Sequence, residues 1–483
     1  MDFFTISLYL GVLFASFFFI FLLRKSNNNG RSNYKLPPGS TGWPLVGDHA
    51  DFAISGPEKF IKKKLAKFPS SEVFQTSLFG ENMAVFCGPA AKKFFFSNEN
   101  KLFTSWLPRS MIKAILFPSS VGDVIKDVTI LQRTFLQDIL KPEALRQYIP
   151  IMDSTAREHI DDEWVPNKDL KVVPLLKKYT LELGCRLLMN IDDPKRIKTL
   201  VEPFNLVASG MLAVPVDFPG TAYNGAIRGG KKMRKELLDI VRERRVELSS
   251  GKEDSGGQDL LSLMLLASDK LGIDERVIET VVTNSMAGML LASYDSPGAA
   301  VAMLLYFLAE LPHVYDAVYK EQIKIAKSKA SEEPLTWEDI EKMRFSWNVA
   351  RESLRLSSST QETFREVTND FTFAGYTIPK GWKALWSMHS THKNPEYFPN
   401  PEEFDPSRFE GSGPPSYTFT PFGGGPRMCP GREYARLAML VFLHNIVTKF
   451  KLEKASKWQN TTYHSISPAS KAALEVRVRP HAK

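Results

Sequence analysis

A cysteine inside a glycine-rich turn is the feature of the sequence best suited to chemistry. Residues 421–431 read PFGGGPRMCPG, so glycines lie on both sides of Cys429. Glycine has no side chain, and the backbone there can pack closely against a flat group. A helix is expected to begin near Arg432, and a cysteine at a helix N-terminus has a lowered pKa and accepts hydrogen bonds from backbone N–H groups. These properties suit a thiolate ligand of haem iron.

The other two cysteines give no such signal. Cys87 and Cys185 lie in apolar segments without a cluster of glycines. A buried structural cysteine is the commoner case, and we adopt it for both. Because 483 residues contain only three cysteines, the chain is no secreted disulfide scaffold, and a reducing compartment is indicated.

Two further pairs of polar residues could act together. Glu352 and Arg355 are three residues apart, so they lie on one face of a predicted helix and can form an ion pair. Such pairs are common on surface helices and are usually worth under about 1 kcal/mol, so this pair alone predicts no function. Asp295 and Ser296 lie on a long apolar helix expected to begin near Glu279, where an acid beside a hydroxyl could pass protons to a buried site. A kinked core helix with an exposed aspartate is the alternative.

Composition and charge limit the classes of protein. Hydrophobic residues make up 43% and charged residues 24% of the chain, as in a folded globular protein. The net charge is +8, but the basic residues are scattered, so no nucleic-acid partner is expected. Apolar spacing of three and four residues dominates after residue 60, which predicts a mainly α-helical fold with small β-sheets. Apolar residues have this helical spacing at 260–267, 277–291, 299–311 and 434–450, and strands are expected at 73–78, 83–87, 371–373 and 376–382.

The first residues predict a membrane anchor. Residues 3–23 are uncharged and apolar, and at 1.5 Å per residue they can span the ~30 Å hydrocarbon layer. A cleaved signal peptide is the alternative, but it has a basic start and an apolar run of roughly 7–15 residues, whereas Asp2 precedes a longer run here. Residues 24–45 are expected to form a polar and proline-rich hinge, and residues 46–483 one domain.

Basic residues directly after the span indicate its orientation. Arg24, Lys25, Arg31 and Lys35 follow the apolar run, which places the rest of the chain in the cytosol by the positive-inside rule. The sequon at 460–462 is then expected to carry no glycan, because acceptor sites are used on the lumenal side. We predict a single-pass protein of the endoplasmic reticulum membrane whose catalytic domain faces the cytosol.

The turn around Cys429 resembles the haem-binding signature of the cytochrome P450 family. That signature, F-x-x-G-x-R-x-C-x-G, is matched without a gap by Phe422, Gly425, Arg427, Cys429 and Gly431. The resemblance extends from the anchor to the C-terminus. It implies the family's mainly helical fold, oxygen-activating chemistry, and a haem b whose iron is bound by the Cys429 thiolate.

The resemblance also implies a structural triad. Residues 404–409 resemble the family's P-x-R-F element, whose arginine here is Arg408. Arg408 would join Glu352 and Arg355, and the three would hold the haem-binding loop in place without taking part in chemistry.

Basic residues are expected to neutralise the haem propionates, because arginine pairs bidentately with carboxylates. The resemblance assigns this role to Arg427, with Phe422 in the same cofactor-binding loop, and Arg365 is expected to be the second arginine. A plain surface arginine is the alternative for Arg365. A basic contact from an earlier helix stays unassigned, with Lys126 and Arg133 as the candidates.

Residues 292–297 resemble the family's oxygen-binding segment A-G-x-[DE]-T, which implies proton delivery by Asp295 and Ser296. Ser296 takes the place of the usual threonine and loses the β-branch that fixes the rotamer, so more oxygen is expected to be wasted as peroxide. Ser293 takes the place of a glycine and is expected to fill the backbone gap used by oxygen. Pro297 cannot donate to the Ser293 carbonyl four residues earlier, so we expect that carbonyl to be free to bind water.

Within the family, the chain resembles plant triterpenoid oxidases that act on β-amyrin-type scaffolds, with taxane diterpenoid hydroxylases next. One departure concerns residues 357–360, which read SSST where relatives carry prolines; this change is expected to relax a loop of the substrate cavity. The stretches that carry the resemblance are 36–47, 212–216, 381–383, 391–395 and 417–422.

These features predict a haem-thiolate monooxygenase that oxidises a pentacyclic triterpenoid of the oleanane or ursane type. It would use O2 and electrons from NADPH through NADPH-cytochrome P450 reductase. A taxane-type hydroxylase is one alternative, and an enzyme that rearranges or dehydrates an oxidised substrate without a reductase is another; Asp295 and Ser296 favour the monooxygenase. A helical membrane protein without haem is the plainest alternative. The apolar loop at 211–219 could enter the bilayer near the cavity mouth, or could equally be a buried loop.

Overall fold

The structure of the chain is a computed structural model. It describes residues 34–40, 42, 47–69, 71–116, 135–137, 139–211, 213–250, 259–269, 274–330, 332–358, 362–455 and 474–481, together with residues 11, 12, 15, 16 and 19. The expected anchor at 3–23 lies outside the described residues except for those five, and so do Lys126, Arg133 and the sequon. The chain forms two compact units, one of residues 1–106 and 362–390 and the other of residues 107–361 and 391–483.

The first unit is built on a mixed β-sheet in the order β1-β2-β8-β5-β3. β2 and β8 run parallel, and the other neighbouring strands run antiparallel. A separate hairpin of β6 and β7 and two main helices, α2 and α3, complete this unit. The bounds are α2 (His49–Lys67), β1 (Val73–Leu78), β2 (Glu81–Phe86), α3 (Gly88–Ser97), β3 (Phe103–Ser105), β5 (Glu362–Val367), β6 (Phe371–Phe373), β7 (Tyr376–Ile378) and β8 (Lys383–Ser387).

The turn between β1 and β2 contains two residues, Phe79 and Gly80, with φ angles of 56° and 77°. Positive φ at both positions matches the twist of a tight hairpin, and glycine adopts it without strain. Phe79 adopts it at a cost, which its edge-to-face contacts with Phe52 and Phe364 offset.

The second unit is mainly helical. Its helices before the cysteine loop are α4 (Arg109–Ile115), α6 (Pro142–Glu163), α7 (Val172–Met189), α8 (Pro194–Gly210), α9 (Ala222–Ser249), α10 (Leu260–Asp269), α11 (Glu275–Glu310), α12 (Pro312–Lys327), α13 (Trp337–Lys342) and α14 (Arg344–Leu356). The short helix α15 (His389–His392) crosses the boundary between the units. The remainder holds η1 (Pro406–Phe409), η2 (Gly425–Arg427), α16 (Arg432–Lys449) and a sheet β4-β10-β9 of β4 (Asp169–Lys171), β9 (Phe450–Lys454) and β10 (Glu475–Pro480).

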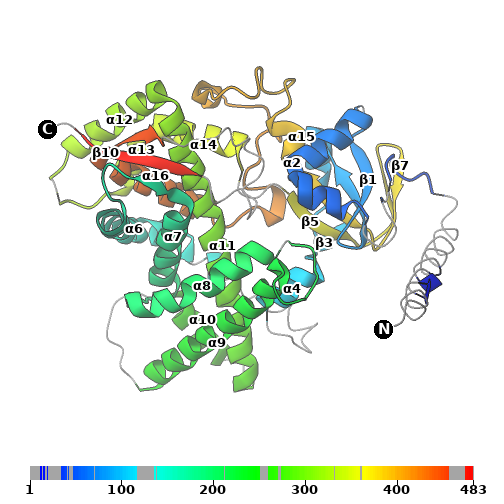
Figure 1. Cartoon of the computed structure of the whole chain (residues 1–483), viewed down its shortest axis with the longest axis horizontal. Helices are drawn as coiled ribbons and strands as arrows, with labels where there is room; N and C mark the ends of the chain where they lie inside the picture. Colours follow the sequence, from blue (N-terminus) through cyan, green and yellow to red (C-terminus); the bar gives the residue numbers. More distant parts are fainter. Residues whose placement is uncertain are drawn as a thin grey trace. The chain divides into compact units, whose positions relative to one another are not determined.

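The long helix α11 runs through the second unit and divides its core into two parts (Figure 1). Its first half packs with α8, α9 and α10 in one hydrophobic cluster, which includes Met286 and Tyr294. Its second half packs with α6, α12, α14 and α16 in another, which includes Leu304 and Leu308. Helix α7 contributes to both clusters. Burial on nearly all sides explains why α11 is apolar around its whole circumference.

Among the described residues, α11 is the one helix long and apolar enough to cross a membrane. Two thirds (67%) of its most apolar window is buried within the protein, so α11 serves as a core helix. The N-terminal anchor stays a prediction.

The mainly α-helical fold predicted from the sequence is confirmed. The predicted strands at 73–78 and 371–373 have the observed bounds, and α16 begins at Arg432 as expected. The apolar segments at 277–291 and 299–311 lie in one helix, which continues through Pro297 as expected for the long helix that carries Asp295 and Ser296. Tertiary packing on α7 and on the two core clusters holds this helix together where the proline removes one backbone hydrogen bond.

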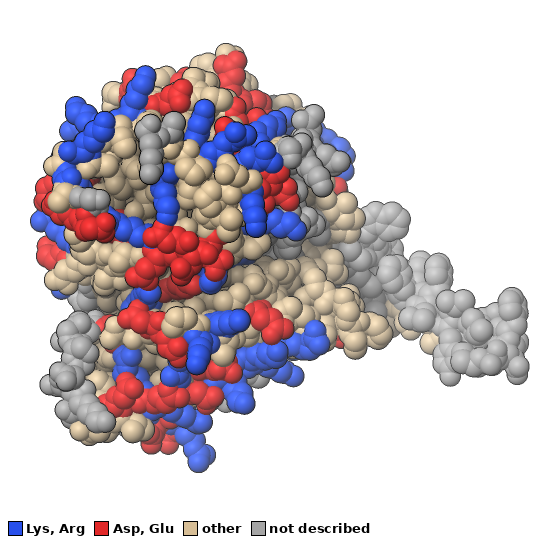
Figure 2. All heavy atoms as spheres, turned by 60° about the vertical axis from the view of Figure 1, so that its left-hand side comes forward, with Lys and Arg blue, Asp and Glu red and all other residues tan. Residues whose placement is uncertain are grey.

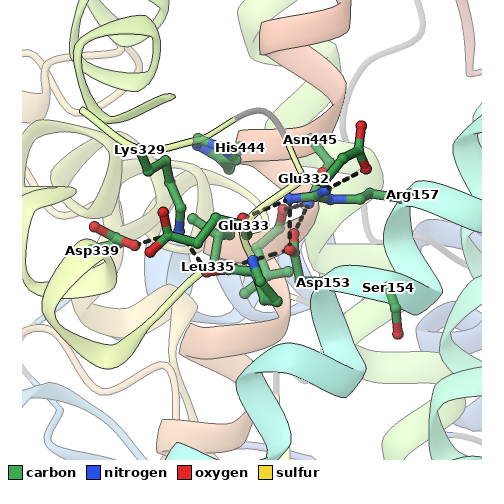
Figure 3. A network of polar contacts seen from close by, with 12 residues as sticks. Asp153, Ser154, Arg157, Lys329, Glu332, Glu333, Leu335, Asp339, His444 and Asn445 are labelled. Carbon is green, nitrogen blue, oxygen red and sulfur yellow. Dashed lines mark hydrogen bonds and ion pairs between the residues drawn. The ribbon is translucent and has the colours of Figure 1, made fainter. Parts of the chain in front are cut away.

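A polar network ties α6 and α16 of the second unit to the segment before α13 (Figure 3). Asp153 on α6 pairs with Arg157 at 2.9 Å and accepts hydrogen bonds from Asn445 (2.7 Å) and from the Leu335 N–H (3.2 Å). His444 on α16 lies 2.8 Å from the side-chain oxygen of Gln322 on α12. Because these groups are mostly buried, their hydrogen bonds fix one arrangement of the helices.

On the face drawn in Figure 2, basic and acidic side chains of the described residues are interspersed over the surface. The described residues on this face therefore form no single basic field.

Candidate active site

Cys429 lies in a tight loop directly before α16. Gly423 and Gly425 have φ angles of 75° and 67°, a backbone conformation that a side chain would strain. The Cys429 N–H donates to the Phe422 carbonyl at 2.9 Å and closes the loop. Cys429 itself is exposed. The loop therefore presents one accessible sulfur, held by its own backbone.

The protonation of Cys429 differs from the sequence-based expectation of a lowered pKa. Enclosure by neighbouring protein raises the pKa of the thiol, and this effect exceeds the lowering by the Gly431 backbone and by the positive charge of Arg432. The expectation was wrong because it weighed the helix N-terminus and left out desolvation. A bound metal ion would itself supply the positive charge that stabilises the thiolate.

The other cysteines behave as structural residues. Cys87 and Cys185 are buried, with 4% and 0% of their surface exposed. Burial raises the pKa of each thiol to about 12, so both stay protonated and unreactive.

The structure brings the three residues of the predicted triad together. Glu352 and Arg355 on α14 form two parallel contacts of 2.7 and 2.8 Å, and both side chains are completely buried. Arg408 on η1 lies 3.4 Å from the same carboxylate. The Asp405 N–H also donates to Glu352, at 2.9 Å. The carboxylate therefore joins α14 to the segment that precedes the cysteine loop.

All five N–H groups of Arg355 have an acceptor. Two bind Glu352, and the others bind the backbone carbonyls of His392 (2.7 Å), Pro401 (2.7 Å) and Glu403 (3.1 Å). A fully buried guanidinium would be costly without such partners. Arg355 thus fixes three points of the chain between residues 392 and 403.

His392 connects the triad to the cysteine loop. Its backbone carbonyl accepts from Arg355, and its Nε2 accepts from the Thr420 N–H at 3.0 Å. The Thr420 carbonyl in turn accepts from the Gly423 N–H, also at 3.0 Å. A continuous series of hydrogen bonds therefore runs from the triad to the turn that holds Cys429, which agrees with the holding role inferred for the triad.

The remaining predicted residues of this loop are half-buried. Phe422 packs against the core cluster of α6, α12, α14 and α16, and it anchors the loop from within. Arg427 ends η2, two residues before Cys429. Its contact with a haem propionate stays a prediction.

Arg365 lies on β5 in the other unit. Its Nε donates to Glu99 at 2.7 Å, its Nη1 donates to the Phe364 carbonyl at 2.7 Å, and its side chain is only 10% exposed. This burial excludes the alternative of a plain surface arginine. Its contact with a haem propionate is not tested by the structure.

One face of α11 is open although the middle and the second half of the helix are mostly buried. Gly288, Ala292 and Ser296 follow one another at four-residue spacing and so share this face. A side chain built at Gly288 would meet no atom within 4 Å, Ala292 is exposed, and Ser296 is half-buried. The face leaves room for a ligand beside the Ser296 hydroxyl.

Asp295 is directed to another side of α11, towards α7. Its carboxylate forms an ion pair of 2.5 Å with Lys177 of α7, whose side chain is 6% exposed. The two helices pack closely there, because Gly184 and Gly298 lack side chains at the points of contact. The sequence predicted Asp295 but not its partner.

Ser293 also faces α7. A Cβ at Gly184 would lie 2.9 Å from the Ser293 hydroxyl, which donates to the Leu290 carbonyl at 3.0 Å. The sequence predicted that Ser293 would fill the backbone gap used by oxygen. The Ser293 side chain instead faces α7, and the open face of α11 is formed by Ala292 and Ser296. Thr180 donates to the Tyr294 carbonyl at 2.8 Å, one residue beyond the carbonyl expected to be freed by Pro297.

Comparison with known proteins identifies this arrangement. The family model described as Cytochrome P450 matches residues 37–474. The chain belongs to the cytochrome P450 family. Members of the family use a haem whose iron is bound by a cysteine thiolate. The exposed sulfur of Cys429, its glycine loop and the open face of α11 fit such a flat group.

Curated relatives cover nearly the whole cytochrome P450 chain. It is 50% identical over 477 residues to the beta-amyrin 6-beta-monooxygenase of Solanum lycopersicum, with 98% of both chains covered. It is 48% identical over 474 residues to the beta-amyrin 28-monooxygenase of Kalopanax septemlobus, with 97% of both covered. Among solved structures, the retinoic acid-bound cyanobacterial CYP120A1 is 25% identical, with a TM-score of 0.79 over 93% of this chain and 100% of the other. The chain is a cytochrome P450 monooxygenase.

Sequence reasoning missed several partners of the predicted residues. His392 lies in the stretch 391–395 that carried the family resemblance, but no spacing rule assigned it a contact. Lys177 and Glu99 are separated from their partners by more than one hundred residues, so no local pattern could reveal them. Such partners follow from the packing of the whole chain.

Proposed function

We propose that this cytochrome P450 oxidises a pentacyclic triterpenoid of the β-amyrin type. The observation that supports it most is identity of 46–50% over nearly the full chain to relatives named as beta-amyrin monooxygenases. The reaction would consume one C–H bond of the substrate, one O2, two electrons and two protons, and would release one hydroxylated product and one water. The haem, when bound, supplies the activation of oxygen.

The residues of the chain take distinct roles in this proposal. Cys429 binds the haem iron as thiolate, and Arg427 and Arg365 pair with the propionates. Ser296, on the open face of α11, donates a hydrogen bond towards the oxygen site. Asp295 exchanges protons with water, and water passes them on to the Ser296 hydroxyl, because the carboxylate faces α7 and the hydroxyl lies on the open face of α11.

The triad of Glu352, Arg355 and Arg408 keeps the cysteine loop in one conformation. It touches neither substrate nor oxygen in this proposal. The buried hydrogen bonds of Glu352 with Arg355 and with the Asp405 N–H, together with the ion pair to Arg408, support a rigid platform for the cofactor.

The electron donor and the membrane complete the proposal. Two electrons per turnover must come from a redox partner, and we propose NADPH-cytochrome P450 reductase. We also propose an endoplasmic reticulum anchor at residues 3–23, with the catalytic units in the cytosol. The loop after α8 supports a second contact with lipid, since Val214, Val216 and Phe218 are 47%, 52% and 66% exposed. Exposed apolar side chains in one loop favour an apolar surface over water.

The decisive experiment is expression of the full chain with a plant NADPH-dependent reductase and a panel of triterpene and taxane scaffolds. Products are identified by mass spectrometry and NMR. A hydroxylated β-amyrin-type product that requires NADPH supports the proposal. Oxidation of taxanes alone would assign the other substrate class, and NADPH-independent conversion of pre-oxidised substrates would assign the rearrangement class.

A further inference from the structure

Lys177 contacts two consecutive residues of α11. Its ammonium lies 2.5 Å from the Asp295 carboxylate and 5.1 Å from the centre of the Tyr294 ring. The carboxylate attracts the ammonium by charge, and the ring face attracts it as well. The lysine is 5% exposed, so water screens these contacts little. The position of Lys177 therefore depends on Tyr294, and the orientation of Asp295 depends on Lys177.

Tyr294 is held at three points. Its side chain is fully buried, and its hydroxyl donates to the side-chain oxygen of Asn205 on α8 at 2.5 Å. Its backbone carbonyl accepts from Thr180 on α7 at 2.8 Å. Burial, and next the charge of Asp295, raises the pKa of Tyr294, so the hydroxyl stays protonated and keeps donating.

Asn205 links this arrangement to the surface of the second unit. It is an exposed residue of α8, although the hydroxyl it binds is buried. Helix α8 ends five residues later at Gly210 and leads to the loop with exposed Val216 and Phe218. Any ligand that contacts or displaces α8 at Asn205 therefore acts on Tyr294.

We propose that Asn205, Tyr294 and Lys177 are positioning residues that set the orientation of Asp295 for proton transfer, so that the position of α8 governs how much oxygen is converted into product. This inference rests on the proposed role of Asp295. In the transfer, the Asp295 carboxylate takes a proton from bulk water and gives it to a water molecule, which donates one to the Ser296 hydroxyl as that hydroxyl gives one towards oxygen; Asp295 is then again a carboxylate. Lys177 stays charged throughout and only orients the carboxylate.

Loss of orientation has a defined consequence. A displacement of about 1 Å in a reacting group can cost about 100-fold in rate. When the proton transfer that leads to product slows, more of the O2 is released as hydrogen peroxide, which takes up two electrons and two protons. The ratio of peroxide to product therefore reports the orientation of Asp295.

The test uses the full-length haem-loaded enzyme with its reductase and β-amyrin, and measures NADPH consumed, peroxide and product. Lys177→Met, Asn205→Leu and Tyr294→Phe are each expected to raise the peroxide-to-product ratio at least about fivefold, within the range set by misplaced catalytic groups. Substrate affinity, from the spectral shift on binding, is expected to change less than about twofold, because these groups lie off the open face of α11. Lys177→Arg keeps the charge and is expected to restore most of the product.

Two neighbouring residues provide matched controls. Lys178→Met removes the adjacent lysine of α7, which pairs with Glu163 and Glu182 at the surface, and Thr199→Val removes an exposed hydroxyl of α8. Both controls are expected to keep the wild-type ratio. A second measurement, thermal unfolding, needs no turnover. The double variant Asn205→Leu with Tyr294→Phe is expected to lower the Tm no more than the more destabilising of the two single variants, because each single variant already removes the same hydrogen bond.

The outcomes separate this inference from the proposed role of Asp295. If Asp295→Asn raises the peroxide ratio but Lys177→Met, Asn205→Leu and Tyr294→Phe do not, the positioning relay is wrong. If Asp295→Asn also leaves the ratio unchanged, the proton-carrying role itself is wrong. If Lys177→Met does not bind haem, as judged by its spectrum, the peroxide ratio of Tyr294→Phe tests the inference instead, because this substitution removes only one oxygen atom.

Discussion

Replacement of Arg355 by lysine tests the support of the cysteine loop. Arg355 uses all five N–H groups, whereas lysine offers three donors on one atom, so at least two of the buried acceptors lose their partner. Each buried group left unsatisfied costs about 1–3 kcal/mol, so Arg355→Lys is expected to destabilise the protein by about 2–6 kcal/mol. Because lysine keeps the positive charge, the loss of stability reports the lost hydrogen bonds of the guanidinium and not a lost charge.

The assay measures haem content and thermal unfolding of the purified enzyme. The entropy of unfolding is about 2.1 cal/mol/K per residue, so a loss of about 2 kcal/mol lowers the Tm of a chain of this size by about 2 °C; a fall of at least about 2 °C is expected, together with loss of bound haem. Arg344→Lys is the matched control, because it makes the same change at an exposed position of the same helix. Haem content and Tm equal to those of Arg344→Lys would refute the reasoning.

Three further predictions concern other parts of the chain. Burial lowers the pKa of His444 to about 4. The contribution of the neutral histidine to the free energy of unfolding is therefore complete above pH 6.5, and ~3 kcal/mol of it is lost as the pH falls from 6.5 towards 4. The free energy of unfolding of His444→Gln is expected to depend less on pH between these values. In haem-free folded protein, a thiol reagent is expected to label Cys429 alone, and in unfolded protein also Cys87 and Cys185, because only Cys429 is exposed. Ser296→Thr adds the β-branch that fixes the rotamer, and it is expected to lower peroxide release about twofold or more at unchanged NADPH consumption, an effect of a few tenths of a kcal/mol.

Each of these predictions has an opposing result. An identical pH slope in His444→Gln would show that another group carries the pH dependence. Labelling of two or three thiols in the folded protein would contradict the burial of Cys87 and Cys185. Higher peroxide release in Ser296→Thr would show that the freedom of the serine rotamer aids coupling.

Local signals in the sequence predicted local structure well. The glycine-rich turn before Arg432, the hairpin at 73–87 and the pairing of Glu352 with Arg355 depend on residues close in sequence, and the structure contains all of them. The triad needed one long-range element, Arg408, which the family motif supplied and periodicity could not.

Long-range partners explain what the sequence did not predict. Lys177 meets Asp295 only because two helices pack closely at Gly184 and Gly298. Desolvation by neighbouring protein raises the pKa of the Cys429 thiol although the residue is exposed, whereas the helix N-terminus alone predicted a lower pKa. Packing against α7 and the two core clusters keeps α11 continuous across Pro297, as the prediction of one long helix beginning near Glu279 requires.

The central claim is that the Cys429 thiolate binds haem iron in this monooxygenase. The carbon monoxide difference spectrum of the reduced enzyme tests it most directly, with Cys429→Ser as the comparison. The wild-type enzyme is expected to show the red-shifted Soret band of thiolate-bound haem, and Cys429→Ser is expected to lose it, because a serine hydroxyl does not provide the thiolate ligand. A red-shifted band that persists in Cys429→Ser, or is missing from the wild-type enzyme, would contradict the assignment.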